Sequence, residues 1–443
     1  MRLRFGTDGV RGDAEEELTP KRMVALGRAI ARVFRPDFVV IGRDTRLSGE
    51  RIERDLARGL HAEGVRVGRL SVAPTPAVAW SSAHRGVPGI AVSGSHNHWK
   101  DNGVKVFAPG GLKLDDATQS EIEQTWWELE NDDVEGPELQ PAPAVDLPED
   151  LVGYRDSLVA SVEGRRFDGI DVVLDCANGA AFEIAPDIIS WLGARVFLLN
   201  AKPDGRNINE KCGSTHPEVV SRAVVRCGAD VGFAFDGDAD RVIASDEQGR
   251  VVDGDQIIAM CAIDLRDRGR LKNDTVAVTV MSNLGLRMGL RATAIEVVDT
   301  PVGDRYVLEE LDKRGLSLGG EQSGHIIFRD LATTGDGILT ALQVLDLMAR
   351  TGRYLSDIAE TSMTKLPQVL RNVRCSGRDP AIVEKIRPVV EREERLLGDG
   401  GRVLVRMSGT EPVVRVMVEA PTERMASEVA ERIVQAVQSQ DGG

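Results

Sequence analysis

The sequence is poor in cysteine, and it lacks long apolar runs and an apolar secretory signal at its start. Its five cysteines are widely scattered and form no C-x-x-C pair, which argues against a disulfide framework and a zinc ribbon. No apolar run approaches the roughly 20 residues that a membrane-spanning helix needs, so we expect no membrane insertion. The missing signal predicts a cytoplasmic location.

An excess of basic residues is also missing. The 55 lysines and arginines are outnumbered by 70 aspartates and glutamates, which gives a formal net charge of −15. Because nucleic-acid binding depends on a basic surface that displaces phosphate counterions, no nucleic-acid partner is expected. A small phosphorylated molecule can still bind in a local basic pocket of an acidic protein.

The length of 443 residues exceeds what one compact core usually holds. Helix and strand patterns alternate in three successive stretches, and an acidic, proline-rich segment at 131–150 separates the first two. This pattern predicts an α/β fold of three similar mixed α/β domains, followed by a smaller α+β domain at the C-terminal end. The expected domains are residues 1–150, 151–253, 254–368 and 369–443.

A polar loop at 92–98 follows the apolar run 89–91. It contains Ser95, where a buried strand ends, and we expect an exposed hydroxyl that serves as the reacting atom. Lys105 follows beyond a predicted turn at 101–103, from which it can return to the same place as a proton shuttle. Taken alone, Lys105 is more typical of a surface lysine.

Three aspartates, Asp236, Asp238 and Asp240, alternate with small residues after an apolar strand pattern. Such a loop can direct three carboxylates at one hard cation, for which Mg²⁺ is the first choice. An EF-hand loop is disfavoured, because Arg241 stands where that loop needs glycine and a strand rather than a helix precedes it. A solvated acidic turn neutralised by Arg241 is the remaining alternative.

Two further stretches carry chemistry. Near the C-terminal end, hydroxyls, a glycine turn and two guanidinium groups can hold a phosphate. A hairpin with surface arginines is equally compatible with this pattern. The residues are Arg406, Ser408, Gly409, Thr410 and Arg415. The glycine-framed segment with Glu321, Ser323 and His325 is interpreted as extended, so that these three side chains face one side and contact sugar hydroxyls. A lone histidine is more often structural than catalytic.

Together these stretches resemble the α-D-phosphohexomutase family, whose motifs they match in order over nearly the whole chain. The motifs lie at 5–12, 42–46, 95–97, 101–103, 207–209, 212–218, 236–241, 319–325, 334–337 and 406–415. The resemblance implies four domains around one cleft, a phosphoryl group on Ser95, and Mg²⁺ held by Asp236, Asp238, Asp240 and the phosphoserine oxygen.

The resemblance also implies roles for the remaining residues. Lys105 and His325 would be general acid and base, and Arg11 and Arg241 would support the transferring phosphoryl group. The group around Arg415 would hold the second phosphate, and Glu321 and Ser323 would bind ring hydroxyls. The expected substrate is glucosamine 6-phosphate, converted through a 1,6-bisphosphate intermediate, and a homodimer is expected.

Two residues beside Ser95 depart from the family pattern, which usually has alanine at the position of Gly94 and proline at that of His98. These changes predict a looser loop, in which His98 is either a tolerated substitution or a new acid, base or ligand. Alternative functions are a mutase for glucose or mannose phosphates and a regulatory protein that has lost catalysis.

Overall fold

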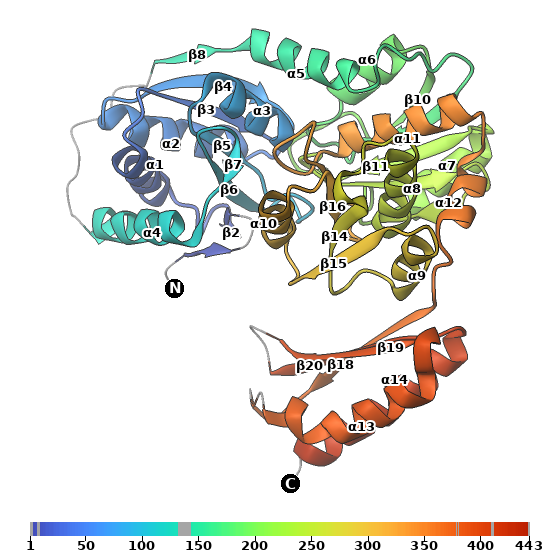
Figure 1. Cartoon of the computed structure of the whole chain (residues 1–443). Coiled ribbons are helices and arrows are strands. Elements are labelled where there is room, and N and C mark those ends of the chain that lie inside the picture. Colours follow the sequence, from blue (N-terminus) through green and yellow to red (C-terminus); the bar gives the residue numbers. More distant parts are fainter. Residues whose placement is uncertain are drawn as a thin grey trace. The chain divides into compact units, whose positions relative to one another are not determined.

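The computed structural model describes residues 3–6, 9–131, 143–377, 379, 381–408 and 412–441. Its elements form four separate β-sheets that follow one another along the chain, which confirms the predicted α/β class (Figure 1). The chain divides into two compact units: the first holds 1–281 and 294–360, and the second holds 282–293 and 361–443.

The first sheet has eight strands. Its order is β1 (Phe5–Gly6), β2 (Gly9–Asp13), β6 (Asp101–Ala108), β5 (Gly89–Val92), β3 (Phe38–Arg43), β4 (Arg66–Val72) and β8 (Ala144–Asp146), with β7 (Leu112–Lys113) beside β6. Strands β4, β3 and β5 are parallel, whereas β6 runs antiparallel to β5. Its helices are α1 (Pro20–Phe34), α2 (Gly49–Ala62), α3 (Thr75–Arg85) and α4 (Asp116–Asn131).

The second sheet has the order β10 (Arg195–Leu199), β9 (Asp171–Asp175), β11 (Val231–Phe235), β12 (Val242–Asp246) and β13 (Val251–Val252). The third has the order β15 (Glu296–Thr300), β14 (Thr275–Thr279), β16 (Leu318–Gly320) and β17 (Ile326–Phe328). The helices of this part are α5 (Pro148–Ala160), α6 (Ile184–Trp191), α7 (Glu218–Cys227), α8 (Gly254–Asp267), α10 (Asp304–Arg314), α11 (Gly337–Thr351) and α12 (Leu355–Ser362), and the short helix η1 (Lys272–Asp274) precedes β14.

One strand arrangement recurs in these three sheets. Strands β4-β3-β5-β6, β10-β9-β11-β12 and β15-β14-β16-β17 share the same order, in which three parallel strands are followed by one antiparallel strand. In each sheet one loop joins the last parallel strand to the antiparallel strand. These three equivalent loops are 93–100, 236–241 and 321–325, which are the loops that the sequence singles out.

The second unit contains a three-stranded antiparallel sheet in the order β18 (Gln368–Arg374), β20 (Val413–Glu419) and β19 (Arg402–Met407). Helices α13 (Ala381–Leu397) and α14 (Glu423–Asp441) pack against it, and η2 (Gly398–Gly400) follows α13. This unit also includes α9 (Leu284–Ala292). The buried Glu419 carboxylate accepts bonds from the Leu284 amide (2.9 Å) and Arg402 Nε (2.7 Å), and so connects α9 to the sheet.

Local predictions differ from the structure at two places. Residues 101–103 belong to strand β6 rather than to a turn. The segment 321–325 is a turn rather than an extended strand, because Gly324 has a φ of +90° and its amide donates to the Glu321 carbonyl at 3.0 Å.

In the part of the chain that the structure describes, no helix has both the length and the apolar character needed to cross a membrane.

Helices α1 and α2 touch through two glycines. Helix α1 starts at Pro20 after the N-cap Thr19, and buries Met23, Leu26 and Ile30 on the face toward α2 and the sheet. A Cβ atom on Gly27 would lie against the Leu56 carbonyl oxygen, and one on Gly59 against the Val24 carbonyl oxygen. The two backbones are therefore too close for any side chain at these positions.

We predict that Gly59→Ala destabilises the protein by about 1–2 kcal/mol. Alanine favours a helix by about 1 kcal/mol over glycine, but the methyl group would force α2 away from α1, and overpacking costs about 1–3 kcal/mol. Chemical denaturation followed by circular dichroism measures the change. Gly377→Ala is the control, because an added methyl group there meets nothing within 4 Å. A stability gain in Gly59→Ala would contradict this close contact.

Candidate active site

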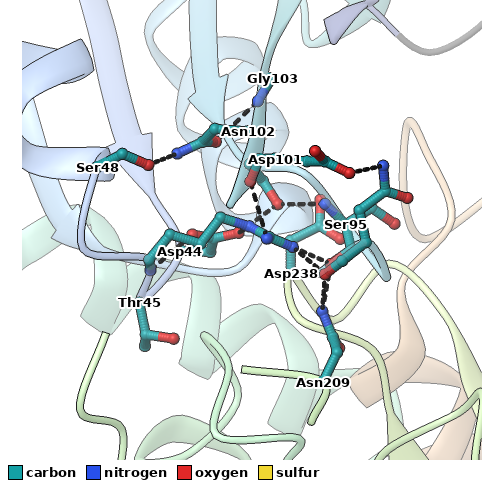
Figure 2. Close-up of polar contacts among 12 residues, drawn as sticks. Asp44, Thr45, Ser48, Ser95, Asp101, Asn102, Gly103, Asn209 and Asp238 are labelled. Carbon is teal, nitrogen blue, oxygen red and sulfur yellow. Dashed lines mark hydrogen bonds and ion pairs between the residues drawn. The ribbon is translucent and has the colours of Figure 1, made fainter. Parts of the chain in front are cut away.

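Ser95 lies in the loop between β5 and β6, and its side chain is fully buried rather than exposed as the sequence predicts. Its Oγ donates to Asp236 Oδ2 at 2.7 Å and lies 3.2 Å from His96 Nδ1. Its backbone φ of +50° is in the left-handed region, which is uncommon for a residue with a side chain. Figure 2 shows Ser95 among polar contacts from several segments.

The three aspartates converge as the sequence predicts. Asp236, Asp238 and Asp240 are buried, and one carboxylate oxygen of each lies within 4.8 Å of the others. Asp236 directly follows strand β11, which is the strand context that disfavours an EF-hand. Thr75 Oγ1 donates to Asp238 Oδ2 at 2.5 Å and fixes that side chain.

This cluster fits a metal ion. Asp238 Oδ1 and Asp240 Oδ1 are buried oxygens that accept no hydrogen bond from the residues that the structure describes. A buried carboxylate oxygen is costly unless a cation or a hydrogen-bond donor compensates it. Carboxylate oxygens are also the ligands that hard divalent cations prefer. The buried triad could therefore bind a metal ion.

A lysine and a histidine border the cluster. Lys105 projects from β6, and its Nζ lies 2.8 Å from Asp238 Oδ2 and 2.7 Å from Asp240 Oδ2. His325 Nδ1 lies 3.8 Å from Asp240 Oδ1, and the Gly335 amide donates to His325 Nε2 at 3.2 Å. Since Nε2 accepts this bond, the neutral ring carries its proton on Nδ1.

The electrostatics of the cluster follow from burial and charge. Burial, reinforced by Asp240 and Asp238, raises the pKa of Asp236 well above its ordinary value. Burial opposes ionisation of Asp240 as well, but Lys105 and then His325 outweigh it and hold its pKa well below the ordinary range. Burial lowers the pKa of His325, whereas Asp240 and Asp304 raise it to a net value above the ordinary one.

A cavity of about 460 Å³ lies in the same unit, and its lining includes Arg11, Arg241, Asp304 and Glu321. Arg241 Nε lies 3.8 Å from Asp240 Oδ1, so this cavity borders the aspartate cluster. Glu321 Oε1 accepts from the Gly303 amide at 3.1 Å, and Ser323 Oγ donates to Glu321 Oε2 at 3.3 Å. The fold therefore brings two arginines, Glu321 and the triad to one place.

The predicted phosphate-binding residues belong to the second unit. Arg406 of β19 pairs directly with Arg415 of β20, and Ser408 is buried, with its amide donating to the Val413 carbonyl at 2.8 Å. Burial and then the neighbouring Arg415 lower the pKa of Arg406. Two like charges at opposed positions of a sheet are unfavourable without an anion between them. Gly409 and Thr410 lie outside the described residues.

The sequence interpretation includes the motif 42–46 but assigns no role to its residues that hold the Ser95 loop. Asp44 and Arg46 follow β3, and both are buried. Asp44 accepts from Ser93 Oγ at 2.7 Å and from Arg46 Nε at 2.9 Å. The available signal is an ion pair at alternate positions after an apolar strand, but a salt bridge on the surface has the same pattern.

The two departures near Ser95 have structural explanations. A Cβ on Gly94 would approach Arg46 Cζ to 2.9 Å, so the missing side chain provides room for this guanidinium group. The His98 side chain is exposed and packs at 5.6 Å, with a tilt of 43°, against Trp99. Its backbone carbonyl, not its imidazole, accepts from Arg46 Nη1 at 2.5 Å.

Family models match almost the whole chain with phosphoglucomutase/phosphomannomutase domains. The alpha/beta/alpha domains I, II and III match residues 2–133, 153–249 and 253–366, and the C-terminal domain matches residues 370–436. The chain belongs to this family. Its four sheets lie one in each of these matches, apart from β8 at 144–146, β13 at 251–252 and the first two residues of β18 at 368–369.

Curated relatives and solved structures agree with the family. Phosphoglucosamine mutase of Salinispora arenicola is 48% identical, covering 98% of both chains, and that of Pelotomaculum thermopropionicum is 48% identical, covering 100% of both. A phosphoglucomutase/phosphomannomutase family protein of Burkholderia thailandensis has a TM-score of 0.81 at 22% identity, covering 99% of this chain and 98% of that one.

A second solved structure is N-acetylphosphoglucosamine mutase of Aspergillus fumigatus in complex with GlcNAc-6P and magnesium. It has a TM-score of 0.69 at 19% identity, covering 100% of this chain and 96% of that one. At this identity the likeness shows the shared fold.

We predict that the His96 ring stays neutral at pH 6 in the folded, metal-free protein. Burial, followed by the charges of Arg241 and Arg11, lowers its pKa from 6.5 to about 4. As the pH falls from 6.5 to 4, the unfolded chain takes up a proton that folded His96 does not. The free energy of unfolding therefore declines over this range, and this part of the decline is absent in His96→Gln.

NMR of the ring nitrogens in chelator-treated protein measures the titration, and denaturation at several pH values measures the stability. The unfolded chain in denaturant is the reference for the ordinary titration. A folded His96 ring that is half-protonated at pH 6 would contradict this assignment.

Proposed function

We propose that the protein is a phosphoglucosamine mutase, which interconverts glucosamine 6-phosphate and glucosamine 1-phosphate through a phosphorylated Ser95 and glucosamine 1,6-bisphosphate. The carrying observation is the buried Ser95 hydroxyl at 2.7 Å from Asp236, in a cluster of three carboxylates. Two curated relatives that are 48% identical and carry this name support the substrate. The product would serve amino-sugar nucleotide and cell-wall precursor synthesis.

The proposed cofactor is Mg²⁺, held by Asp236, Asp238, Asp240 and an oxygen of phosphorylated Ser95. When bound, it would neutralise the charge on the transferring phosphoryl group. Asp238 Oδ1 and Asp240 Oδ1, which accept no hydrogen bond from the described residues, support this assignment. The magnesium named with the Aspergillus fumigatus enzyme is a further support.

The chain's own residues would provide the proton transfer. In the first half-reaction the bond from phosphorus to Ser95 Oγ breaks and a bond from phosphorus to the sugar oxygen forms. The proton of the sugar hydroxyl leaves as this bond forms, and Ser95 Oγ is protonated once the phosphoryl group has left. We assign this exchange to Lys105 and His325, because both border the carboxylate cluster.

The remaining residues would position the substrate. Arg11 and Arg241 line the cavity beside the cluster and suit the transferring phosphoryl group. Glu321 and Ser323, which share a hydrogen bond, suit ring hydroxyls. The second phosphate is assigned to the second unit, because an anion would relieve the repulsion between its two opposed arginines. The proposed residues are Arg406, Ser408, Gly409, Thr410 and Arg415.

Three wider assignments complete the proposal. The four family matches support four domains at residues 1–150, 151–253, 254–368 and 369–443. A homodimer and a cytoplasmic location are proposed by resemblance to the family. The alternatives are a mutase for glucose or mannose phosphates, since the family includes phosphoglucomutases and phosphomannomutases, and a regulatory protein without catalysis.

We predict that the wild type converts glucosamine 6-phosphate faster than glucose or mannose 6-phosphate, and that Ser95→Ala loses at least a thousandfold in kcat. Without Oγ no phosphoryl group can be carried on the enzyme. A coupled assay with each sugar, its 1,6-bisphosphate and Mg²⁺ measures the rates. Ser120→Ala is the control, because this exposed hydroxyl bonds only within helix α4.

Intact mass and peptide mapping add a second test, with one phosphoryl group expected on Ser95. A wild type that converts none of the three sugars, or Ser95→Ala with full activity, would contradict the proposed reaction. A preference for glucose or mannose 6-phosphate would favour the alternative mutase.

We also predict that Asp238→Asn weakens Mg²⁺ binding at least tenfold while the protein remains folded. The amide keeps the size of the side chain but replaces one charged oxygen ligand by a neutral group. Titration calorimetry of chelator-treated protein measures the affinity. Asp168→Asn is the control, because Asp168 is exposed and pairs with Arg166 on the surface. Equal affinity in Asp238→Asn and wild type would exclude Asp238 as a ligand.

A further inference from the structure

The backbone of Ser95 is held in an unfavourable conformation. A left-handed φ is unfavourable for a residue other than glycine, asparagine or aspartate, and it persists only where the surroundings impose it. At Ser95 this φ is +50°. The same conformation carries the Oγ that lies 2.7 Å from Asp236. The groups that impose this conformation therefore also determine where the hydroxyl points.

Arg46 supplies the first of these groups. Its guanidinium group is fully buried, and its five N–H donors all have acceptors. Nε donates to Asp44 Oδ2, three other bonds end on backbone carbonyls of the Ser95 loop, and the fifth ends on the carbonyl of Asp101, the first residue of β6. Nη2 donates to the carbonyls of Ser95 (2.8 Å) and Asn97 (2.9 Å), and Nη1 donates to those of His98 (2.5 Å) and Asp101 (2.9 Å).

Asn209 supplies the second group, from a segment more than 100 residues away. Its Nδ2 donates to the same two carbonyls, Ser95 O at 2.8 Å and Asn97 O at 3.0 Å. Figure 2 shows Asn209 approaching this loop from the side opposite to Asn102 and Ser48. The backbone N–H of Asn209 donates to the Ala177 carbonyl at 2.9 Å, which fixes Asn209 to the loop that follows β9.

We propose that Arg46 and Asn209 are positioning residues for the phosphoryl transfer, and that together they form a clamp on the Ser95 and Asn97 carbonyls that fixes Ser95 in its left-handed conformation. This inference rests on the proposed mutase reaction. The clamp joins the Ser95 loop of the first sheet to the segment between β10 and α7. Further along the same part of the chain, the loop 236–241 carries the three aspartates. The clamp therefore sets Ser95 Oγ against the aspartate cluster.

A looser clamp has two consequences for the phosphorylated protein. Transfer to the sugar slows, because reacting atoms that are misplaced by a fraction of an ångström lose rate. Loss of the phosphoryl group to water increases relative to turnover. In that side reaction water attacks phosphorus, the bond to Ser95 Oγ breaks, inorganic phosphate leaves, and Oγ takes up a proton.

The test compares Asn209→Ala and Asn209→Asp with wild type and with Asn207→Ala as the matched control. Asn207 lies two residues away, and the hydrogen bonds of its side chain to other described residues stay within its own loop, at Asp204 N (3.0 Å) and Lys202 O (2.9 Å). Steady-state kinetics give kcat and KM. Intact mass, followed over time without sugar, gives the lifetime of phosphorylated Ser95. Thermal unfolding verifies that each variant is folded.

For Asn209→Ala we expect a kcat about tenfold lower, a KM within about twofold of wild type, and a phosphoserine lost severalfold faster relative to turnover. Asn207→Ala should match wild type in all three. Asn209→Asp keeps the volume but turns the donor into an acceptor that faces two carbonyl oxygens. If Asn209 is part of a clamp, the kcat of Asn209→Asp should be at least as low as that of Asn209→Ala. If Asn209 only fills space, the kcat of Asn209→Asp should be nearer to that of wild type.

The inference is wrong if Asn209→Ala keeps both kcat and phosphoserine lifetime, if Asn207→Ala is equally impaired, or if Asp restores the activity that Ala loses. Arg46→Lys gives an independent check, because lysine keeps the charge but lacks the planar set of N–H donors of the guanidinium group. We expect the same fall in kcat at unchanged KM. A wild type that converts no sugar phosphate would refute the proposed function instead of the clamp.

Discussion

Three buried carboxylates in close contact are the constraint on which the first unit depends. Asp236, Asp238 and Asp240 are at most 2% exposed, and such a concentration of negative charge is unfavourable away from water unless cations approach it. Lys105 comes from the first sheet and His325 from the third, while the aspartates themselves belong to the second. The three aspartates and the two side chains that border them therefore come from all three sheets of this unit.

The recurring strand order explains how the chain brings these groups to one place. The last parallel strand and the antiparallel strand after it are joined by one loop in each sheet, and the loops of β5, β11 and β16 carry Ser95, the aspartates and His325. In α/β sheets ligands bind beyond the carboxyl ends of the parallel strands, so the loops that follow these strands carry the polar side chains. Three copies of one arrangement thus bring Ser95, the three aspartates and His325 to equivalent positions, where the proposed reaction assigns them the roles of nucleophile, metal ligands and proton-transfer group.

Much of this organisation could be predicted from the sequence, because it rests on local patterns. Apolar runs followed by polar loops marked the ends of β5 and β11, and the alternation of Asp236, Asp238 and Asp240 marked the cation site. The turn at 321–325 was not predictable from spacing, since Gly324 adopts a φ of +90° that alternation cannot reveal. Arg46 and Asn209 lie in the motifs 42–46 and 207–209, but the sequence patterns assign neither residue a role, because their partners are backbone carbonyls far along the chain that no residue pattern encodes.

The clamp also bears on the unusual residues beside Ser95. Gly94 and His98 predict a looser loop if the loop owes its shape to its own side chains. The structure shows instead that donors outside the loop hold its carbonyls, and every residue type has a carbonyl. His98 can therefore replace proline while its oxygen still accepts from Arg46, and Gly94 leaves the space that the guanidinium group occupies. Arg46 and Asn209 therefore help to set the shape of the loop through bonds that do not depend on which side chains stand at positions 94 and 98.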